Sequence, residues 1–308
     1  MDANDENPNG DADDAALTPG TSFGAYTISR RIGKGGMGSV YESTHGTLGK
    51  RVAIKVLHPA VANRAQVRTR FLREAQAVSR LRHPHVVDAS DFGVHEGVPF
   101  LVMELLDGET LAQRLAREGA LSPELAAATL LPVCSAIAAA HAEGIIHRDL
   151  KPGNIFLART RLGAEVPKVL DFGISKFIDD AQAPKGDLTN SSALLGTVWY
   201  MSPEQALDAR AVTPASDQYA LGVILYECVT GQRAFHGESF FVAMRAITDG
   251  VFVPPRSLRP TISAELEAVI LRAMRRDPSE RFASIDAFAR ALLAFATPAA
   301  RASWEPVF

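Results

Sequence analysis

The sequence predicts an α+β protein of two lobes, a strand-rich first lobe followed by a mainly helical second lobe. Between residues 26 and 102 the apolar residues form short strand-like runs separated by glycine-rich turns. Beyond the stretch LLDGET, from about residue 106, long alanine- and leucine-rich patterns of helical type replace them. Because each part would have its own core, we expect a cleft between the lobes, which is a common place for a ligand.

Individual elements follow from the same patterns. Strands are predicted for YTISRRIG, SVYEST, RVAIKVL and PFLVMEL, and one helix is predicted over 64–81, where apolar residues recur at helical spacing. In the second lobe we expect helices over 122–142, 216–230 and 263–275, and short strands over 155–157 and 168–170.

Composition and charge exclude several classes of protein. The 308 residues are 47% hydrophobic and 22% charged, which is ordinary for a globular protein with a full-size core. Residues 1–22 hold six acidic side chains and no basic one, so subtracting them from the net charge of −3 leaves about +3. This excess is too weak to indicate a nucleic-acid partner.

The first 22 residues are rich in Asp, Asn, Gly and Pro, and we expect them to be a disordered acidic tail. They have no positive n-region and no apolar h-region, which excludes a signal peptide. The folded domain is expected to cover 23–295, and 296–308 to be a C-terminal tail or linker.

No membrane span is expected in this chain. The nearest candidate, LAAATLLPVCSAIAAA, contains Pro132 and many alanines and fits a core helix better. Cys134 and Cys228 lie in apolar segments without metal-type spacing, so we expect buried free thiols in a reducing compartment. We therefore expect a cytoplasmic location.

The stretch IGKGGMGSV carries Gly33, Gly35 and Gly38 at GxGxxG spacing. The dinucleotide-binding fold needs a helix directly afterwards, whereas SVYEST is β-prone and another strand follows it. The glycines are therefore expected at the tip of a hairpin, where backbone N–H groups can approach phosphates. On this motif alone, a plain glycine turn remains the alternative.

In RVAIKVL, the strand period places Ala53, Lys55 and Leu57 on one face. A lysine between apolar positions needs an anionic partner, and Glu74 lies on the apolar face of the predicted helix. We expect a Lys55–Glu74 pair in which the lysine also holds phosphate oxygens. The alternative is a lysine that extends its amine to solvent and an exposed Glu74.

The stretch GIIHRDLKPGNIFL places Asp149, Lys151 and Asn154 among apolar residues, at a cost in free energy unless a partner or ligand pairs them. Asp171, in KVLDFGISK, follows a predicted strand. Its carboxylate and the Asn154 amide are hard oxygen ligands that suit Mg²⁺ bound to nucleotide phosphates. Asp149 then remains as a base or orienting group, and Lys151 to neutralise charge. No serine lies on a GxSxG elbow, so nothing indicates a Ser/His/Asp site.

Together these motifs resemble those of the eukaryotic-type (Hanks-type) serine/threonine protein kinases, and SPEQA with a short activation segment is most similar to the bacterial branch. The resemblance covers roughly 26–293 and rests, in order, on GKGGMG, VAIK, Glu74, HRDLKPGN, DFG, GTVWYMSPE, Asp217 and Arg281. It implies the bilobal protein-kinase fold, with a small antiparallel β-sheet lobe and one key helix over about 23–105 and a larger helical lobe over about 106–295.

The resemblance implies transfer of the γ-phosphoryl group of ATP to serine or threonine hydroxyls of protein substrates, with Mg²⁺, or Mn²⁺ in its place. Asp149 would accept or steer the hydroxyl proton, and Lys151 would neutralise the moving phosphoryl group. Asn154 and Asp171 would hold the metal ion. Further residues would bind ATP: Ile32, Gly33, Gly35, Gly38, Val40, Ala53, Lys55, Glu74, Met103, Glu104, Leu106 and Phe156.

Other matched positions imply scaffold roles. His147 and Phe172 resemble members of the hydrophobic spine anchored by Asp217, and Glu204 and Arg281 a buried ion pair. Two alternatives to an active protein kinase are a pseudokinase scaffold, which usually lacks one of the functional residues present here, and a small-molecule kinase, which GTVWYMSPE disfavours.

The resemblance also implies regulation by autophosphorylation of the activation segment, through a transient dimer. Thr189 and Ser191 fall where bacterial relatives are modified, and Arg148 and Lys176 where a phosphate is bound. Gly153 stands where kinases that favour arginine before the target residue often carry glutamate.

Overall fold

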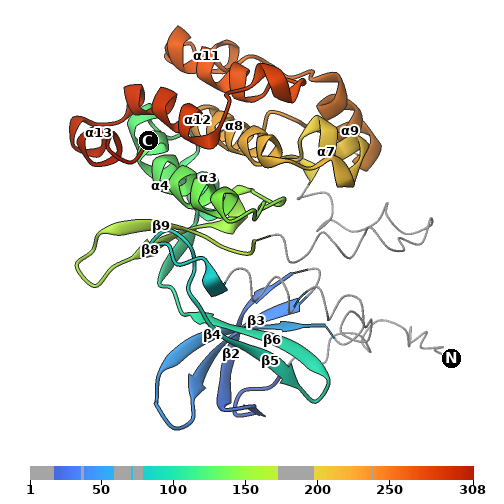
Figure 1. The fold of residues 1–308 in the computed structure, drawn as a ribbon, viewed down its shortest axis with the longest axis vertical. Helices are drawn as coiled ribbons and strands as arrows, with labels where there is room; N and C mark the ends of the chain where they lie inside the picture. The colour runs from blue at the N-terminus through green and yellow to red at the C-terminus, as the bar shows by residue number, and fades with distance from the viewer. Residues whose placement is uncertain (1–16, 36–37, 59–70, 72–78, 173–197, 238) are drawn as a thin grey trace, which may run out of the picture. The chain divides into compact units, whose positions relative to one another are not determined.

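The computed structural model describes residues 17–35, 38–58, 71, 79–172, 198–237 and 239–308. The chain divides into two compact units (Figure 1). Unit 1 comprises residues 1–79 and 88–105, and unit 2 comprises residues 80–87 and 106–308. The predicted helix over 64–81 lies outside the described residues except for Phe71 and residues 79–81.

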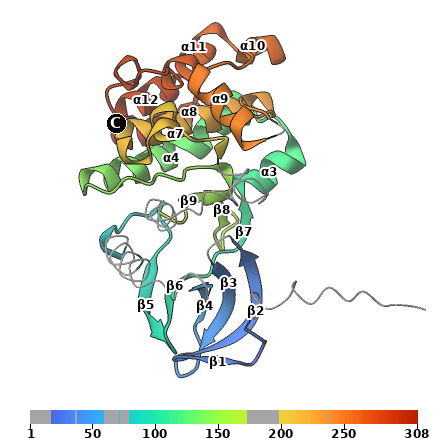
Figure 2. The same ribbon diagram turned by 90° about the vertical axis from the view of Figure 1, so that its right-hand side faces the viewer.

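Unit 1 contains a six-stranded antiparallel sheet in the order β1-β2-β3-β4-β6-β5, whose strong twist is visible in Figure 2. The four predicted strands are confirmed, and β1 and β5 are additional. The strands are β1 (Ser22–Phe23), β2 (Tyr26–Lys34), β3 (Gly38–His45), β4 (Arg51–Leu57), β5 (Ala89–His95) and β6 (Val98–Glu104).

One face of this sheet carries the core of unit 1. Alternate residues of β2, Tyr26 and Ile28, are buried while Thr27 between them is exposed, as the strand period requires. The neighbouring interior strands β4 and β6 contribute apolar residues to the same cluster, which comprises Phe23, Tyr26, Ile28, Tyr41, Val52, Ile54, Val56, Phe100 and Val102. Leu17 and Val98 pack against it.

Unit 2 combines a three-stranded antiparallel sheet with helices. The sheet has the order β7-β8-β9, and the predicted strands at 155–157 and 168–170 correspond to β8 and β9. Its strands are β7 (Gly108–Thr110), β8 (Ile155–Arg159) and β9 (Glu165–Val169). Residue Val86, from the separate segment 80–87, adds a parallel bridge to Val169 at the edge of β9.

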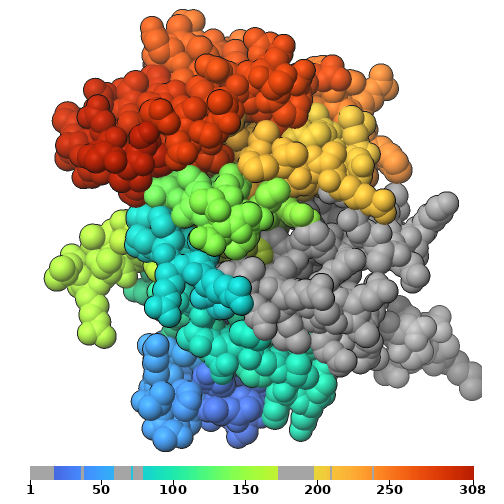
Figure 3. All heavy atoms as spheres, viewed as in Figure 1, coloured from blue at the N-terminus to red at the C-terminus, as the bar shows by residue number. Residues whose placement is uncertain are grey.

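The helices of unit 2 include the three that the sequence predicts, which correspond to α4, α8 and α11. They are α3 (Leu111–Glu118), α4 (Pro123–Ala142), η1 (Pro152–Asn154), α7 (Pro203–Leu207), η3 (Ala209–Ala211), α8 (Pro214–Thr230), α9 (Phe240–Asp249), α10 (Pro255–Leu258), α11 (Ala264–Ala273), η4 (Pro278–Glu280), α12 (Ile285–Leu292), η5 (Leu293–Phe295) and α13 (Pro298–Trp304). Figure 3 shows the surface over the C-terminal helices α11 to α13 as one continuous face.

Helix α4 is the core helix of unit 2. It is long and apolar enough to cross a membrane by length and composition, but 61% of that apolar window is buried inside the protein. It packs against α8, α12 and β9, and Pro132 lies buried inside it. Burial against other helices accounts for its apolar character on all sides.

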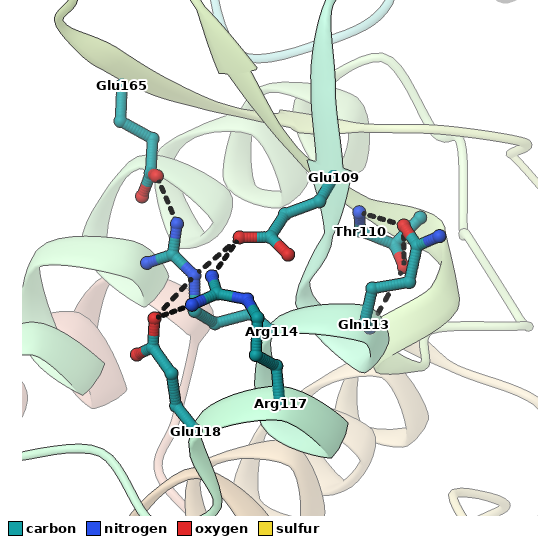
Figure 4. Close-up of polar contacts among 7 residues, drawn as sticks. All are labelled: Glu109, Thr110, Gln113, Arg114, Arg117, Glu118 and Glu165. Atoms are coloured by element: carbon teal, nitrogen blue, oxygen red, sulfur yellow. Dashed lines mark hydrogen bonds and ion pairs between the residues drawn. The ribbon is translucent and has the colours of Figure 1, made fainter.

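Helix α3 is joined to the sheet of unit 2 by ion pairs (Figure 4). The half-buried guanidinium of Arg114 lies 2.8 Å from Glu109 on β7 and 2.6 Å from Glu165 on β9. Thr110 and Gln113 form a capping box, with the Thr110 hydroxyl accepting from the Gln113 N–H. The first turn of α3 is therefore fixed beside β8, which follows the predicted catalytic segment.

Candidate active site

The predicted catalytic loop is held by the carboxylate of Asp217, in the first turn of α8. This buried side chain accepts hydrogen bonds from the backbone N–H groups of His147 (2.8 Å) and Arg148 (2.9 Å). Its Oδ2 also lies 2.8 Å from Nε2 of His141 on α4. Hydrogen bonds to the backbone satisfy a carboxylate that would otherwise be costly to bury.

Arg148 has a φ of +66°, in the left-handed region that residues other than glycine rarely adopt. Such a conformation costs about 1–3 kcal/mol and persists only where neighbouring groups hold it. Asp217 holds the Arg148 N–H, and Nε2 of Gln205 donates to its carbonyl at 2.9 Å. The turn at Arg148 therefore fixes the position of the next residue, Asp149.

Asp149 is buried, and its polar neighbours are the other residues that the sequence singles out in this loop. Nζ of Lys151 lies 2.9 Å from the Asp149 Oδ2. Nδ2 of Asn154 donates to the Asp149 carbonyl at 2.8 Å and to its Oδ2 at 3.2 Å. The structure thus brings a carboxylate, an ammonium group and an amide together, as the paired polar cluster that the sequence requires.

The two predicted metal ligands lie next to strands of the same sheet, Asn154 at the end of η1 directly before β8 and Asp171 two residues after β9. Leu170 N–H donates to the Asn154 carbonyl at 2.8 Å, and Asp171 is the next residue, with a φ of +48°. Because the amide nitrogen of Asn154 is used by Asp149, its Oδ1 is the atom of that side chain left to accept a cation. An amide oxygen and a carboxylate fit Mg²⁺, which retains waters and binds few protein groups.

In the part of the chain that the structure describes, no group of three or more His, Cys, Asp or Glu side chains could hold a metal ion. Such a cluster would indicate a zinc or multi-carboxylate centre that binds its metal without a substrate. The predicted pair of Asn154 and Asp171 would be a site of another kind, in which substrate phosphates complete the coordination of the metal.

His147 links the loop to the metal-ligand segment. Its Nδ1 accepts from the Asp149 N–H at 3.3 Å, so the neutral ring carries its proton on Nε2 and donates to the Leu170 carbonyl at 2.9 Å. Complete burial lowers the pKa of His147, against the opposing effect of Asp217. Its ring also lies 4.9 Å from that of Phe172. His147 is therefore a neutral structural group.

In unit 1, the glycine-rich stretch forms the predicted hairpin between β2 and β3. The Gly35 N–H donates to the Gly38 carbonyl at 2.9 Å, while residues 36–37 lie outside the described residues. A side-chain carbon on Gly38 would lie 2.2 Å from the Val56 carbonyl oxygen, so any larger residue would displace the neighbouring strand. A strand, and not a helix, follows the glycines, which excludes the dinucleotide-binding fold.

Several predicted ATP-binding residues are neighbours on the same sheet. Ala53 of β4 pairs with Met103 of β6, and both side chains are buried. Lys55, two residues after Ala53, pairs with Val40 of β3 and is half-buried on an interior strand. Glu74 lies outside the described residues, so the predicted Lys55–Glu74 pair stays a prediction.

The remaining predicted ATP contacts differ in exposure. Ile32 on β2 is exposed, and Gly33 pairs with Val40. The Glu104 N–H donates to the Asp88 carbonyl at 3.0 Å, so an adenine contact by the Glu104 backbone would use its carbonyl. Leu106 and Phe156 belong to unit 2, and both side chains are half-buried.

A family model described as the protein kinase domain matches residues 26–293. The chain belongs to the protein kinase family. Among curated relatives, serine/threonine-protein kinase Pkn1 of Myxococcus xanthus is 43% identical over 273 residues, which is 89% of this kinase chain and 38% of the relative. Serine/threonine-protein kinase PknE of Mycobacterium bovis is 38% identical over 280 residues, 90% of this chain and 48% of the relative.

The kinase chain thus spans less than half the length of these two relatives. Among solved structures, the PknI kinase domain of Mycobacterium tuberculosis aligns with a TM-score of 0.70 at 30% identity, covering 91% of this chain and 100% of that one. The predicted protein-kinase fold is confirmed.

The kinase chain also contains the predicted buried ion pair. Arg281, whose side chain is fully buried, donates to both carboxylate oxygens of Glu204 at 2.9 and 2.8 Å. Burial acts to raise the pKa of Glu204, but the hydrogen bonds and charge of Arg281 outweigh it and the pKa lies below its ordinary value. The pair ties the start of α7 to the chain after η4.

Sequence reasoning missed two polar contacts of this kinase domain. Gln205 holds the Arg148 carbonyl, and the hydroxyl of Tyr200 donates to Oε2 of Glu227 on α8 at 2.5 Å. Burial raises the pKa of Glu227. An acid inside the apolar run LGVILYECV was the available signal for Glu227, whereas nothing in the sequence distinguished Gln205 from surface glutamines.

Proposed function

We propose that this kinase domain transfers the γ-phosphoryl group of ATP to serine and threonine hydroxyls of protein substrates. The observation that carries the proposal is the group of Asp149, Lys151 and Asn154 on a loop fixed by Asp217. The relatives Pkn1 and PknE, named as serine/threonine-protein kinases, support it. The seryl or threonyl specificity agrees with a lysine two residues after the catalytic aspartate.

In the proposed reaction, the substrate hydroxyl oxygen attacks the γ-phosphorus while the bond to the β,γ-bridging oxygen breaks and ADP leaves. Asp149 receives the hydroxyl proton or orients the hydroxyl for attack. Lys151, 2.9 Å from Asp149, is placed to neutralise charge on the transferred group. The buried loop keeps both groups in place during the reaction.

The match to the protein-kinase motifs supports the ATP contacts of this proposal. Lys55 would hold the α and β phosphates, the glycine-rich hairpin would approach the phosphate oxygens, and Ala53, Met103 and Glu104 would contact adenine. Leu106 and Phe156 would also contact adenine, and Asn154 and Asp171 would hold Mg²⁺. The metal ion, or Mn²⁺ in its place, would neutralise the phosphate charges.

We extend the proposal to regulation and location. Phosphorylation of Thr189 or Ser191 by a second copy in a transient dimer would switch the enzyme on, with Arg148 and Lys176 binding the phosphate. Thr189, Ser191 and Lys176 lie outside the described residues. A cytoplasmic location, where ATP is available, agrees with the free and buried Cys134 and Cys228.

The first prediction tests the chemistry. Asp149→Asn keeps the size of the side chain but removes the carboxylate, so transfer from ATP to a generic protein should fall at least roughly 10²-fold. Binding of Mg²⁺·ATP, measured by calorimetry, should change less than about threefold, because other residues contact the nucleotide.

Near-normal turnover in Asp149→Asn would contradict the assignment of Asp149. A wild-type protein that binds ATP without transferring phosphate would indicate a pseudokinase scaffold. Transfer confined to small molecules would indicate a small-molecule kinase. The assay therefore separates all three functions.

A further inference from the structure

The chain after α12 is fixed to unit 2 by a short helix, α13. The helix begins after Thr297, whose hydroxyl accepts from the Ala300 N–H at 3.2 Å. Arg301 sets its direction, because the guanidinium donates to the carbonyls of Leu293 (3.1 Å) and Ala294 (2.8 Å). We refer to residues 297–308 as the C-terminal clasp.

At the end of α13, the indole of Trp304 packs against the imidazole of His85. The ring centres are 5.4 Å apart and the planes are inclined by 52°. Phe308 stacks on the indole, at 5.9 Å and 24°. Aromatic contacts of this kind stabilise a structure beyond the apolar area that they bury. The clasp is therefore attached at both its start and its end.

His85 is in turn bonded to β9. Its Nδ1 lies 2.8 Å from the Pro167 carbonyl and so carries the proton that it donates, and its own carbonyl accepts from the Val169 N–H at 2.8 Å. The Val87 N–H donates to the Val169 carbonyl at 3.0 Å. Residues 85–87 thus extend the sheet of unit 2 as a short parallel edge, with Trp304 against the ring of its first residue.

The same segment is fixed to helix α4 through His83. Its Nδ1 accepts from the His85 N–H at 3.2 Å, so the neutral ring carries its proton on Nε2, which donates to the Ser135 hydroxyl at 3.1 Å. The rings of His83 and His85 are 5.7 Å apart. His85 therefore has contacts with α4 through His83, with β9, and with the clasp.

Strand β9 leads directly to the metal-ligand segment. After Val169, both backbone groups of Leu170 are bonded, its N–H to the Asn154 carbonyl and its carbonyl to His147. Asp171 follows with a φ of +48°, a conformation that depends on the support of its neighbours. Displacement of β9 would therefore change the position of the Asp171 carboxylate.

We propose that Trp304 is a positioning residue for the metal ligand Asp171, acting through His85 and β9. The proposal rests on the proposed function, in which Asp171 holds Mg²⁺. The indole covers His85 and confines it to the orientation that bonds Pro167 and Val169. Without this cover, β9 would move over a wider range and Asp171 would be held less firmly for the metal ion.

The test compares Trp304→Ala with Trp304→Phe, which keeps a ring against His85, and with Val307→Ala, an exposed position in the same clasp. The first readout is hydrogen exchange at the backbone amides of Val87 and Val169. The second is the Mg²⁺ concentration that gives half-maximal phosphate transfer at saturating ATP.

In Trp304→Ala we expect exchange at Val87 and Val169 to be roughly fivefold faster, as for the loss of a contact of about 1 kcal/mol. The half-maximal Mg²⁺ concentration should rise roughly three- to tenfold, below the 10–100-fold effect of groups that bond a ligand directly. The rate at saturating Mg²⁺ should be unchanged. Trp304→Phe should restore most of the wild-type exchange rate and Mg²⁺ dependence, and Val307→Ala should match the wild type.

Trp304→Ala with wild-type exchange and wild-type Mg²⁺ dependence would overturn the proposal. So would a lower rate at saturating Mg²⁺ without a change in the half-maximal concentration, which indicates general destabilisation. If Trp304→Ala does not fold, Trp304→Leu keeps apolar cover without the ring and is measured in its place. If the wild type transfers no phosphate, the proposed function is wrong. In that case, faster hydrogen exchange in Trp304→Ala confined to 85–87 and 165–170 would still support the contact between Trp304 and His85, and unchanged exchange would reject it.

Discussion

Two carboxylates of unit 2, the buried Asp217 and the half-buried Glu204, are stabilised in different ways. Asp217 accepts N–H groups of the catalytic loop, so its charge fixes backbone positions. Glu204 pairs with the guanidinium of Arg281, which also donates to the carbonyls of Arg275, Arg276 and Ala215. Removing one partner of such a pair leaves an uncompensated buried charge, a change that typically costs about 3–5 kcal/mol. Asp217 fixes the backbone of the predicted catalytic loop, whereas Glu204 fixes the start of α7 to the chain after η4.

The second prediction concerns Gly38. The carbon added by Gly38→Ala would meet the Val56 carbonyl oxygen at 2.2 Å, so β3 and β4 must separate locally. We expect the free energy of unfolding of unit 1 to fall by about 1–3 kcal/mol, as for other overpacked sites. Urea unfolding, monitored with a probe in unit 1, measures this free energy of unfolding. Gly153→Ala is the matched control, since an added carbon there meets nothing within 4 Å; equal stability of the two variants would contradict the argument.

The third prediction concerns substrate choice at Gly153. This residue offers no carboxylate to a substrate guanidinium, so a peptide library should show weak selection for arginine before the acceptor. Gly153→Glu places a carboxylate on η1 with open space around it, and should increase selection for arginine two or three residues before the acceptor. A wild-type profile already dominated by arginine would show that other acids fill this role.

At the scale of elements, the strands with apolar runs or two-residue alternation were predictable and β5 was not. Its residues, ASDFGVH, are half-buried or exposed, because β5 is an edge strand that pairs with β6 on one side. Exposure removes the apolar pattern on which a sequence prediction depends. Helix α13 is short and was expected to be part of a tail or linker. Its cap, Thr297-Pro298, is a start signal, but the seven-residue helix that follows is too short to show a recurring apolar pattern.

In the candidate site, too, local patterns could be recognised in the sequence and long-range contacts could not. Asp149, Lys151 and Asn154 were recognisable because charged or amide groups stand out among apolar residues, and the structure brings them together. The left-handed turn at Arg148 and the support of its carbonyl by Gln205 depend on residues 57 positions apart in the sequence. Such long-range contacts are set by the packing of α7 and α8, and no local pattern reports them.

The fourth prediction concerns the segment 83–87 and pH. Burial lowers the pKa values of His83 and His85 below 6.5. The charge of His85 lowers the pKa of His83 further, and the charge of Lys168 lowers the pKa of His85 further. The unfolded chain therefore binds protons at a higher pH than the folded one, and the free energy of unfolding should fall as pH drops from 6.5 towards the folded values.

Urea unfolding at three pH values between about 7.5 and 5.5 checks this prediction. A variant with both His83→Gln and His85→Gln should lose part of the pH dependence. The buried His147, whose pKa is also lowered, should supply the rest. A double variant with the full wild-type dependence would show that the titration belongs elsewhere.

At the scale of the whole molecule, switching requires groups from distant parts of the sequence. Arg148 belongs to the catalytic loop, and its backbone is bonded to Asp217 and Gln205. Lys176, Thr189 and Ser191 belong to the segment between Asp171 and Val198, most of which lies outside the described residues. A phosphate in that segment carries nearly two negative charges and forms one to three charge-assisted hydrogen bonds with an arginine or lysine. Phosphorylation is thus expected to order the segment for substrate.

The fifth prediction follows from that expectation. Purified protein should carry phosphate on Thr189 or Ser191, and the double variant Thr189→Ala, Ser191→Ala should lose most of its activity, because the phosphate that is expected to order the segment is then absent. Ser192→Ala, in the same polar stretch, is the matched control and should stay active.

If one copy modifies another in a transient dimer, initial self-labelling should rise with the square of protein concentration, and the wild type should label Asp149→Asn. An active preparation that carries neither phosphate, together with a fully active double variant, would reject this mechanism. Labelling that rises in simple proportion to concentration would reject the dimer and leave modification within a single chain.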